Sequence, residues 1–127
     1  MSIMKSNILI VDDNEDHQVL MEEALKQFLD ETNVVFAGTG EECLLELSKE
    51  NYDAVIVDFN LSDMDGLEVL RRMKDNEYVI PAIMVTAFGD ENIAVDAMKL
   101  GAFDYIVKSD EYLNRLSSII IRVMQEP

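Results

Sequence analysis

Five side chains with reactive or charged groups follow four short apolar runs: the pair Asp12 and Asp13 after one run, and Asp58, Thr86 and Lys108 each after another. Each run predicts a β-strand that ends just before the polar residue. Ligands of open α/β sheets bind at the carboxyl ends of parallel strands. We therefore expect three carboxylates, a hydroxyl and an ammonium to meet at one edge of a sheet.

These groups together predict phosphoryl transfer to a carboxylate. Alone, each is better explained as a turn, capping or solvated residue. Three carboxylates in a partly desolvated pocket repel one another, and a hard divalent cation such as Mg²⁺ removes that repulsion. One carboxylate can then attack a phosphoryl group, while the cation, the ammonium of Lys108 and the hydroxyl of Thr86 offset charge on the phosphoryl oxygens. The chain carries no Gly-rich phosphate loop, so nucleotide binding is not indicated.

The elements that position these residues alternate between two kinds of segment. Short runs rich in β-branched residues span 8–11, 34–37, 54–57, 80–85 and 103–107, and segments of helical periodicity follow them. The runs that start at Ile8, Ala54 and Ile80 are continuously apolar, which is typical of parallel strands covered on both faces. With right-handed crossovers, we predict an α/β fold: a doubly wound five-stranded parallel sheet in a (βα)5 flavodoxin-like three-layer sandwich.

Residues at the predicted helix ends support this division. Asn14, Asp90 and Ser109 are expected N-caps, and residues 39–42 resemble a capping box. Gly101 follows the fourth helical segment, where a left-handed residue ends many helices.

Composition narrows the class of protein. The 127 residues fit one domain, 1–127, and the net charge of −16 disfavours direct contact with nucleic acids and anionic membranes. The single cysteine, Cys43, lies in an apolar helical pattern and is expected to be a small buried residue. No signal peptide or membrane-spanning run is visible, so we expect a cytoplasmic protein.

Four blocks of the sequence resemble response-regulator receiver domains of two-component signalling. They are ILIVDDN at 8–14, VIVD at 55–58 with Leu61 and Asp65-Gly66 after it, MVTA at 84–87, and GAFDYIVK at 101–108. The resemblance covers essentially the full chain. It implies a phosphorylation-dependent switch that receives its phosphoryl group from a sensor histidine kinase or a phosphotransfer protein.

The resemblance also implies roles at the acidic cluster. Asp58 would be the phosphoacceptor. Asp13 would bind Mg²⁺ directly, Asp12 mainly through water, and Asn60 through its backbone carbonyl.

Further roles follow for the switch. Thr86 would move toward the phosphoryl group, Lys108 would pair with it, and Tyr105 would turn inward as Thr86 moves. Ser62 and Ser109 stand where the family commonly has proline. The family's Lys–Pro bond is usually cis, so the geometry of the Lys108–Ser109 peptide is left open.

Two other classes of function remain as alternatives. A dehalogenase-like phosphatase would carry a second Asp two residues after the nucleophile, where this chain has Asn60. A flavodoxin-like cofactor binder would need a hydroxyl- or Gly-rich loop in place of Asp12 and Asp13. The only histidine, His17, is expected to be a surface residue without a catalytic partner.

The last helical segment predicts an output surface. Leu113, Leu116, Ile120 and Val123 form its inward stripe. Ile119 and Ile121 flank that stripe, either partly buried or forming, with the fourth helix and fifth strand, a face for a second copy or a partner. The sequence leaves open whether the chain is a stand-alone regulator or part of a longer protein.

Overall fold

Five strands alternate with five helices in the computed structural model, which describes residues 6–29 and 31–125. The strands are β1 (Ser6–Val11), β2 (Thr32–Ala37), β3 (Ala54–Asp58), β4 (Ala82–Thr86) and β5 (Asp104–Val107). The helices are α1 (Glu15–Lys26), α2 (Gly40–Lys49), α3 (Gly66–Asp75), α4 (Glu91–Lys99) and α5 (Tyr112–Gln125). No helix within the described ranges is long and apolar enough to cross a membrane.

The strands form one parallel sheet in the order β2-β1-β3-β4-β5. The chain moves outward from β1 to β2 and then crosses to β3 on the other side of β1. The order therefore reverses between β1 and β3, where ligands of such sheets bind. The predicted doubly wound sheet is confirmed.

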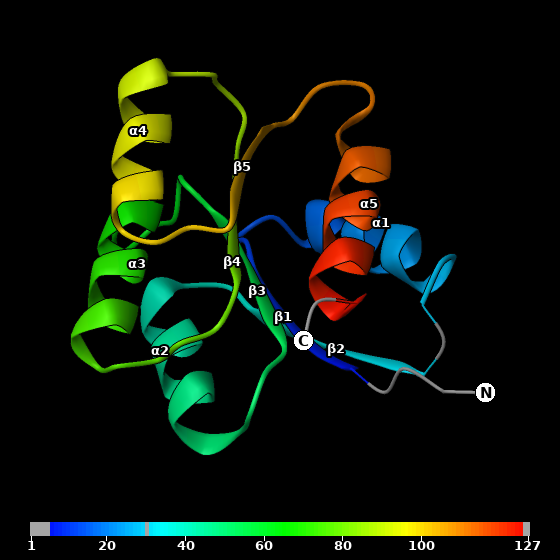
Figure 1. Ribbon diagram of the computed structural model, residues 1–127, viewed down its shortest axis with the longest axis horizontal. Helices are drawn as coiled ribbons and strands as arrows, with labels where there is room; N and C mark the ends of the chain where they lie inside the picture. Colours follow the sequence, from blue (N-terminus) through cyan, green and yellow to red (C-terminus); the bar gives the residue numbers. More distant parts are fainter. Residues whose placement is uncertain (1–5, 30, 126–127) are drawn as a thin grey trace.

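Helices cover both faces of the sheet, with α1 and α5 on one face and α2, α3 and α4 on the other (Figure 1). Alternate residues of β1 show how the strands serve both layers. Ile8 and Ile10 pack in the cluster under α1 and α5, whereas Leu9 and Val11 pack in the cluster under α2, α3 and α4. β3 and β4 are buried along their whole length. A strand buried on both sides needs a continuous apolar run, which is why these runs do not alternate.

Side-chain caps set most helix starts. Asn14, Thr39 and Asp90 each accept a hydrogen bond from the first turn of the following helix, as predicted. Asp65 does the same for α3, although no cap was predicted there. Gly101 follows α4 with a φ of 95°, as its predicted left-handed role requires.

Several predicted boundaries differ from the structure. β1 and β2 each begin two residues earlier than predicted, at Ser6 and Thr32, and β5 begins one residue later, at Asp104. Ser109 is not the N-cap of α5, because the chain first makes a turn in which the amide of Tyr112 donates to the Ser109 carbonyl, at 3.2 Å. The fourth strand begins at Ala82 instead of Ile80, after Pro81, whose missing N–H suits the approach to a central strand better than its interior.

The apolar residues of α5 are more deeply buried than a single stripe requires. Leu116, Ile119, Ile120 and Val123 are all buried, and Ile121 is partly buried against the same cluster. The prediction that Ile119 and Ile121 are partly buried is therefore closer than the prediction of an exposed pair. A partner-binding surface would therefore have to consist of residues other than Ile119 and Ile121.

Candidate functional site

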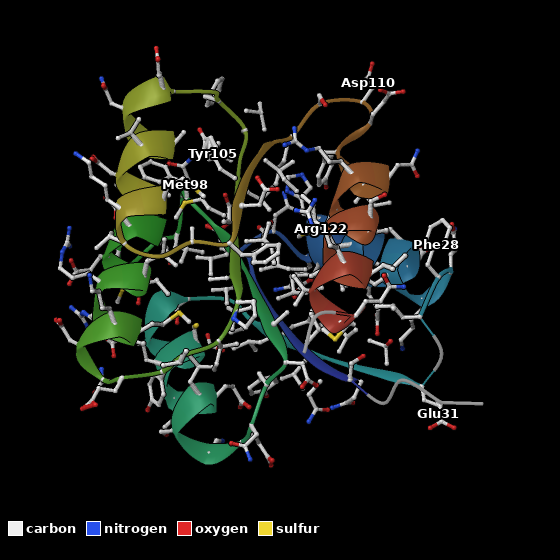
Figure 2. All side chains as sticks on the ribbon, in the orientation of Figure 1. Phe28, Glu31, Met98, Tyr105, Asp110 and Arg122 are labelled. Atoms are coloured by element: carbon white, nitrogen blue, oxygen red, sulfur yellow. The ribbon has the colours of Figure 1, made fainter. Side chains whose placement is uncertain are left out.

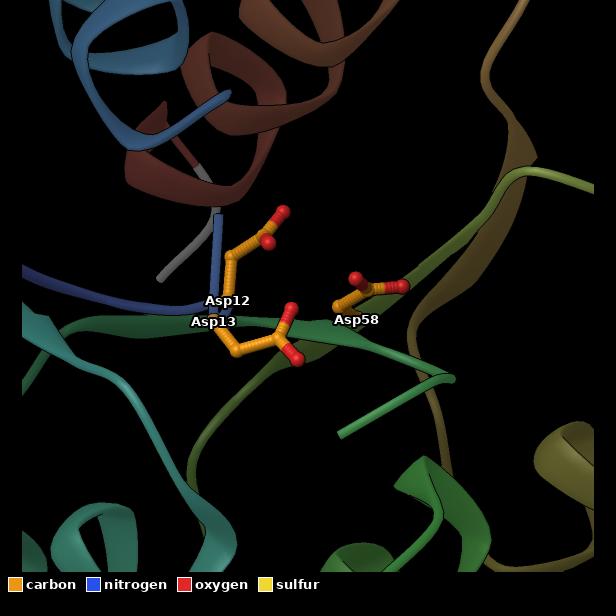
Figure 3. A group of neighbouring side chains, drawn as sticks. All are labelled: Asp12, Asp13 and Asp58. Atoms are coloured by element: carbon orange, nitrogen blue, oxygen red, sulfur yellow. The ribbon is translucent and has the colours of Figure 1, made fainter. Parts of the chain in front are cut away.

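Three carboxylates meet at the carboxyl edge of the sheet. Asp12 and Asp13 follow β1, and Asp58 is the last residue of β3. Figure 3 shows the three carboxylates facing a common space, and one oxygen from each lies within 4.8 Å of the others. Asp12 and Asp58 are buried, whereas Asp13 is exposed. The structure thus brings together the acidic residues that the sequence places at strand ends.

Asp12 is held from several sides. Its Oδ1 accepts a hydrogen bond from the amide of Asn14 at 2.9 Å, and its Oδ2 accepts one from Lys108 Nζ at 3.0 Å. The Gln18 side chain donates to its backbone carbonyl at 2.6 Å. Sequence reasoning missed Gln18; a signal was its place within the first helix, one turn after the polar cluster. These contacts fix the β1 end of the site.

Asp58 is buried as well but is held by fewer hydrogen bonds than Asp12. Its Oδ1 accepts a hydrogen bond from the amide of Asn60 at 3.3 Å, and its Oδ2 lies 3.7 Å from Lys108 Nζ. Burial raises the pKa of Asp58, the nearby charges of Asp12 and Asp13 raise it further, and Lys108 opposes them. The like charges around Asp58 therefore favour a cation beside it.

The backbone packs closely under Asp58. A Cβ atom on Gly66 would lie 3.0 Å from each of three neighbours: the Asp58 carbonyl oxygen, Phe59 Cα and Met84 Sδ. The Gly66 amide donates to the Phe59 carbonyl at 2.7 Å. The glycine after Asp65 thus allows the start of α3 to lie directly against the strand that carries the acceptor.

Lys108 enters the cluster from the end of β5. Its side chain is only 9% exposed, and the Lys108–Ser109 peptide is trans, as are all peptides of the described segments. Its Nζ lies 2.8 Å from His17 Nδ1 as well as 3.0 Å from Asp12. The prediction that His17 has no partner at the site is therefore wrong, because the first turn of α1 carries it next to a lysine far along the chain.

The two predicted switch residues, Thr86 and Tyr105, lie outside the group of side chains that contact the three carboxylates. Thr86 is buried at the end of β4, and its hydroxyl exchanges hydrogen bonds with the backbone of Phe88, at 3.3 and 3.4 Å. Tyr105 is partly buried and projects from β5 on the side of α4 (Figure 2). Its hydroxyl accepts from the Asp90 amide at 3.2 Å and donates to the Asp90 carbonyl at 3.5 Å. Thr86 is thus bonded to the loop before α4, and Tyr105 to the N-cap residue of that helix.

The acidic cluster suits a hard divalent cation. Lys108 offers one positive charge against three carboxylates. The donors are oxygen atoms, which Mg²⁺ prefers, and one oxygen of each carboxylate lies within 4.8 Å of the others. Asn60, whose carbonyl was the fourth predicted ligand, is exposed in the loop after β3 and pairs with Asp65 in an isolated β-bridge.

Sequence comparison identifies relatives with the same pattern. Residues 8–120 match the family model described as the response regulator receiver domain. The transcriptional regulatory protein ZraR of Salmonella typhimurium is 34% identical over 104 residues, which are 82% of this chain and 23% of that protein. The regulatory protein AtoC of Escherichia coli is 32% identical over 120 residues, 94% of this chain and 25% of that protein. The chain thus spans about a quarter of the length of these relatives.

Solved structures agree with the sequence relatives. The BeF3-activated DrrB receiver domain has a TM-score of 0.84 and 26% identity, covering 97% of this chain and 100% of its own. The non-phosphorylated HemR receiver domain of Leptospira biflexa has a TM-score of 0.85 and 26% identity, covering 97% of each chain. The backbone is thus equally similar to an activated and a non-phosphorylated receiver.

The relatives bear on partners and activity as well. Receiver domains are signalling domains that interact with histidine kinases or phosphotransfer proteins, and the family binds Mg²⁺ at an acidic pocket. Because a relative is named a transcriptional regulator, the comparisons give no support to the expectation that nucleic acid plays no part. The match over most of its length shows that the chain belongs to the response regulator receiver domain family, the phosphorylation-dependent switches of two-component signalling.

Proposed function

We propose that Asp58 is the phosphoacceptor of this chain. The observation that carries the proposal is its position at the end of the central strand β3, where it is buried beside the Asp12–Asp13 pair and lies 3.7 Å from the ammonium of Lys108. A carboxylate oxygen of Asp58 attacks the phosphorus of a phosphohistidine on a histidine kinase or phosphotransfer protein. The new P–O bond forms as the P–N bond breaks, and the electron pair stays on the donor's imidazole nitrogen.

We propose that Asp12, Asp13, Asp58 and the Asn60 carbonyl hold Mg²⁺. The support is the convergence of three carboxylates with a single ammonium beside them. Bound Mg²⁺ offsets negative charge on the phosphoryl oxygens. Lys108 pairs with another of those oxygens, and the Thr86 hydroxyl, released from Phe88, donates to a third.

The proposed role is that of a switch and not of an enzyme with an external substrate. Asn60 lacks the acidic proton that a phosphatase of the dehalogenase type would use at that position. Residues 1–127 are proposed to act as one receiver unit. Its location in the cytoplasm stays a prediction.

Output is proposed to pass through α4, β5 and α5. Val95 and Met98 on α4 are 47% and 50% exposed, so they replace Ile119 and Ile121 as the apolar residues that a second copy or another partner would contact. Tyr105 lies on β5, the strand that leads to Lys108, and its hydroxyl is bonded to the N-cap residue of α4, so it is proposed to pass a change at the site to this face. A switch must present its partner with different surfaces in its two states.

The acceptor is tested by labelling with a small phosphodonor and Mg²⁺. We expect one added phosphoryl group in the wild type and none in Asp58→Asn. Asp53→Asn is the matched control, because Asp53 lies just before β3, at the opposite end of the same strand. Labelling of Asp58→Asn at the wild-type level would refute the assignment.

The metal site is tested by thermal unfolding with and without Mg²⁺. A ligand that binds only the folded state raises its stability, by about 2.7 kcal/mol at a concentration 100 times its dissociation constant. We expect Mg²⁺ to raise Tm in the wild type and to have a smaller effect on Asp13→Asn. An unchanged or lowered Tm in the wild type would contradict the site.

The output face is tested by light scattering with and without beryllofluoride. We expect self-association of the wild type to increase with this phosphoryl mimic and to be lost in Met98→Glu. Leu45→Glu on α2 is the control, since Leu45 is 57% exposed, similar to Met98, but lies on a different helix. If the wild type stays monomeric with the mimic, self-association is wrong, and only a different protein could bind this face.

A further inference from the structure

The ammonium of Lys108 has two hydrogen-bond partners and a third group nearby. It donates to Asp12 Oδ2 at 3.0 Å and lies 2.8 Å from His17 Nδ1. Asp58 Oδ2, at 3.7 Å, lies within range of ionic attraction but too far for a hydrogen bond. An ammonium has three N–H donors, so one remains for an additional acceptor on the side of Asp58.

His17 reaches this ammonium because of how α1 begins. Asn14 caps the helix by accepting a hydrogen bond from the His17 amide at 3.1 Å, which places His17 in the first turn, close to Asp12. The His17 side chain is 38% exposed, so one edge of the ring meets solvent and the other meets Lys108. Its Nδ1 also lies 3.7 Å from Asp12 Oδ2.

Only one form of the imidazole fits this contact. A lysine ammonium donates and does not accept, so Nδ1 must be the acceptor and the ring proton must sit on Nε2. A neutral acceptor differs from a carboxylate in one respect that matters here. It fixes the direction of an N–H group without cancelling the charge of the ammonium.

We propose that His17 is a positioning residue for Lys108 in phosphoryl transfer. Together with Asp12, it holds two N–H groups of the ammonium and leaves the third, with its charge only partly offset, for a phosphoryl oxygen on Asp58. The inference rests on the proposed function and adds a residue to it. A solvated histidine that merely touches Lys108 is the alternative that the experiments must exclude.

The first experiment observes the ring itself in metal-free protein. Since His17 is the only histidine in the chain, the side-chain ¹⁵N spectrum contains a single imidazole. At mildly alkaline pH we expect an unprotonated Nδ1 and a protonated Nε2, and a shift of both signals toward the exchange-averaged values of a free imidazole in Lys108→Met. Signals that are the same in both proteins would overturn the inference.

The second experiment measures the rate of Asp58 labelling by acetyl phosphate with Mg²⁺. His17→Leu removes the acceptor, whereas His17→Asn places an amide oxygen about as far along the side chain as Nδ1. We expect the maximal rate to fall about three- to tenfold in His17→Leu, the effect of one hydrogen bond, with little change in the half-saturating donor concentration. We expect His17→Asn to recover most of the rate.

The same pair of variants in a Lys108→Met background separates positioning from a general structural effect. If His17 acts through Lys108, then His17→Leu has no further effect there. Wild-type rates in His17→Leu, equal slowing in both backgrounds, or an Asn variant as slow as the Leu variant would each overturn the inference. Absence of labelling in the wild type would instead contradict the proposed function, and the ring spectrum would still test the contact if a variant failed to fold or to label.

Discussion

The helices on either side of β5 are attached to the molecule in different ways. Among its residues, α4 buries only Ala97 and exposes Val95 and Met98. By contrast, α5 buries five residues along its length: Leu116, Ser117, Ile119, Ile120 and Val123. Figure 1 shows α5 lying beside α1, whereas α4 stands at the outer edge of the opposite layer.

Polar contacts reinforce the difference. The Ser117 hydroxyl donates to the Ala24 carbonyl of α1 at 3.2 Å, and Arg122 lies over the ring of Phe103, 5.3 Å from its centre. For α4, the corresponding contact is a pair of hydrogen bonds between the Tyr105 hydroxyl and the backbone of the N-cap residue Asp90. The contrast indicates that α5 is anchored more firmly than α4. We therefore expect α4, which is bonded to Tyr105, to be the helix that a change at the site displaces.

The largest expected difference is between truncations on the two helices. Leu116→Ala should lower the free energy of unfolding by about 2–5 kcal/mol, because Leu116 is fully buried and the change leaves a cavity. Met98→Ala should change it by less than about 0.5 kcal/mol, because half of Met98 is exposed. Urea unfolding of both variants measures this difference. Similar losses in the free energy of unfolding would contradict the distinction between a firmly anchored α5 and a loosely anchored α4.

An intermediate effect is expected from two adjacent serines of α5. Ser117→Ala should cost about 1 kcal/mol, because a buried hydrogen bond to α1 is lost. Ser118 donates to the Asn114 carbonyl within its own helix and is exposed, so Ser118→Ala should be nearly neutral. If chemical denaturation gave the two variants equal stabilities, the hydrogen bond from Ser117 to α1 would contribute nothing to the anchoring of α5.

The smallest expected effect on overall stability comes from Tyr105→Phe, at a few tenths of a kcal/mol, because its hydroxyl bonds are long and partly exposed. Its local effect should be larger. Amide hydrogen exchange in the first turn of α4 should accelerate, while exchange in the buried turns of α5 should stay as in the wild type. Equal acceleration in both helices would mean that Tyr105 does not hold α4 selectively.

The fold and most of the site could be predicted because they depend on local patterns. A strand buried on both faces must be apolar throughout, and the polar residue that ends it must lie at the carboxyl edge, which places Asp12, Asp58 and Lys108 correctly. His17 could not be predicted in this way. Its contact with Lys108 joins residues 91 positions apart and depends on the angle at which α1 leaves the sheet.

The faces of α5 show a second limit of sequence patterns. Helical periodicity gives the direction of a residue relative to its neighbours but does not reveal how wide the covering surface is. Ile119 is buried because α1 and the sheet enclose a broad part of α5. Similarly, Ser109 has the side chain of a cap, but the intervening turn moves the helix start to Tyr112.

The burial of Cys43 makes the chain convenient for site-specific probes. It is the only cysteine, it is fully buried, and desolvation raises the pKa of its thiol to about 12. The thiolate is the form that reacts with maleimides and disulfide reagents, so the folded protein behaves toward them as if it had no cysteine. A fluorophore or spin label can therefore be attached to a cysteine introduced on the outer face of α4 without first replacing Cys43. Conversely, slow modification of Cys43 itself reports how often the core around α2 opens.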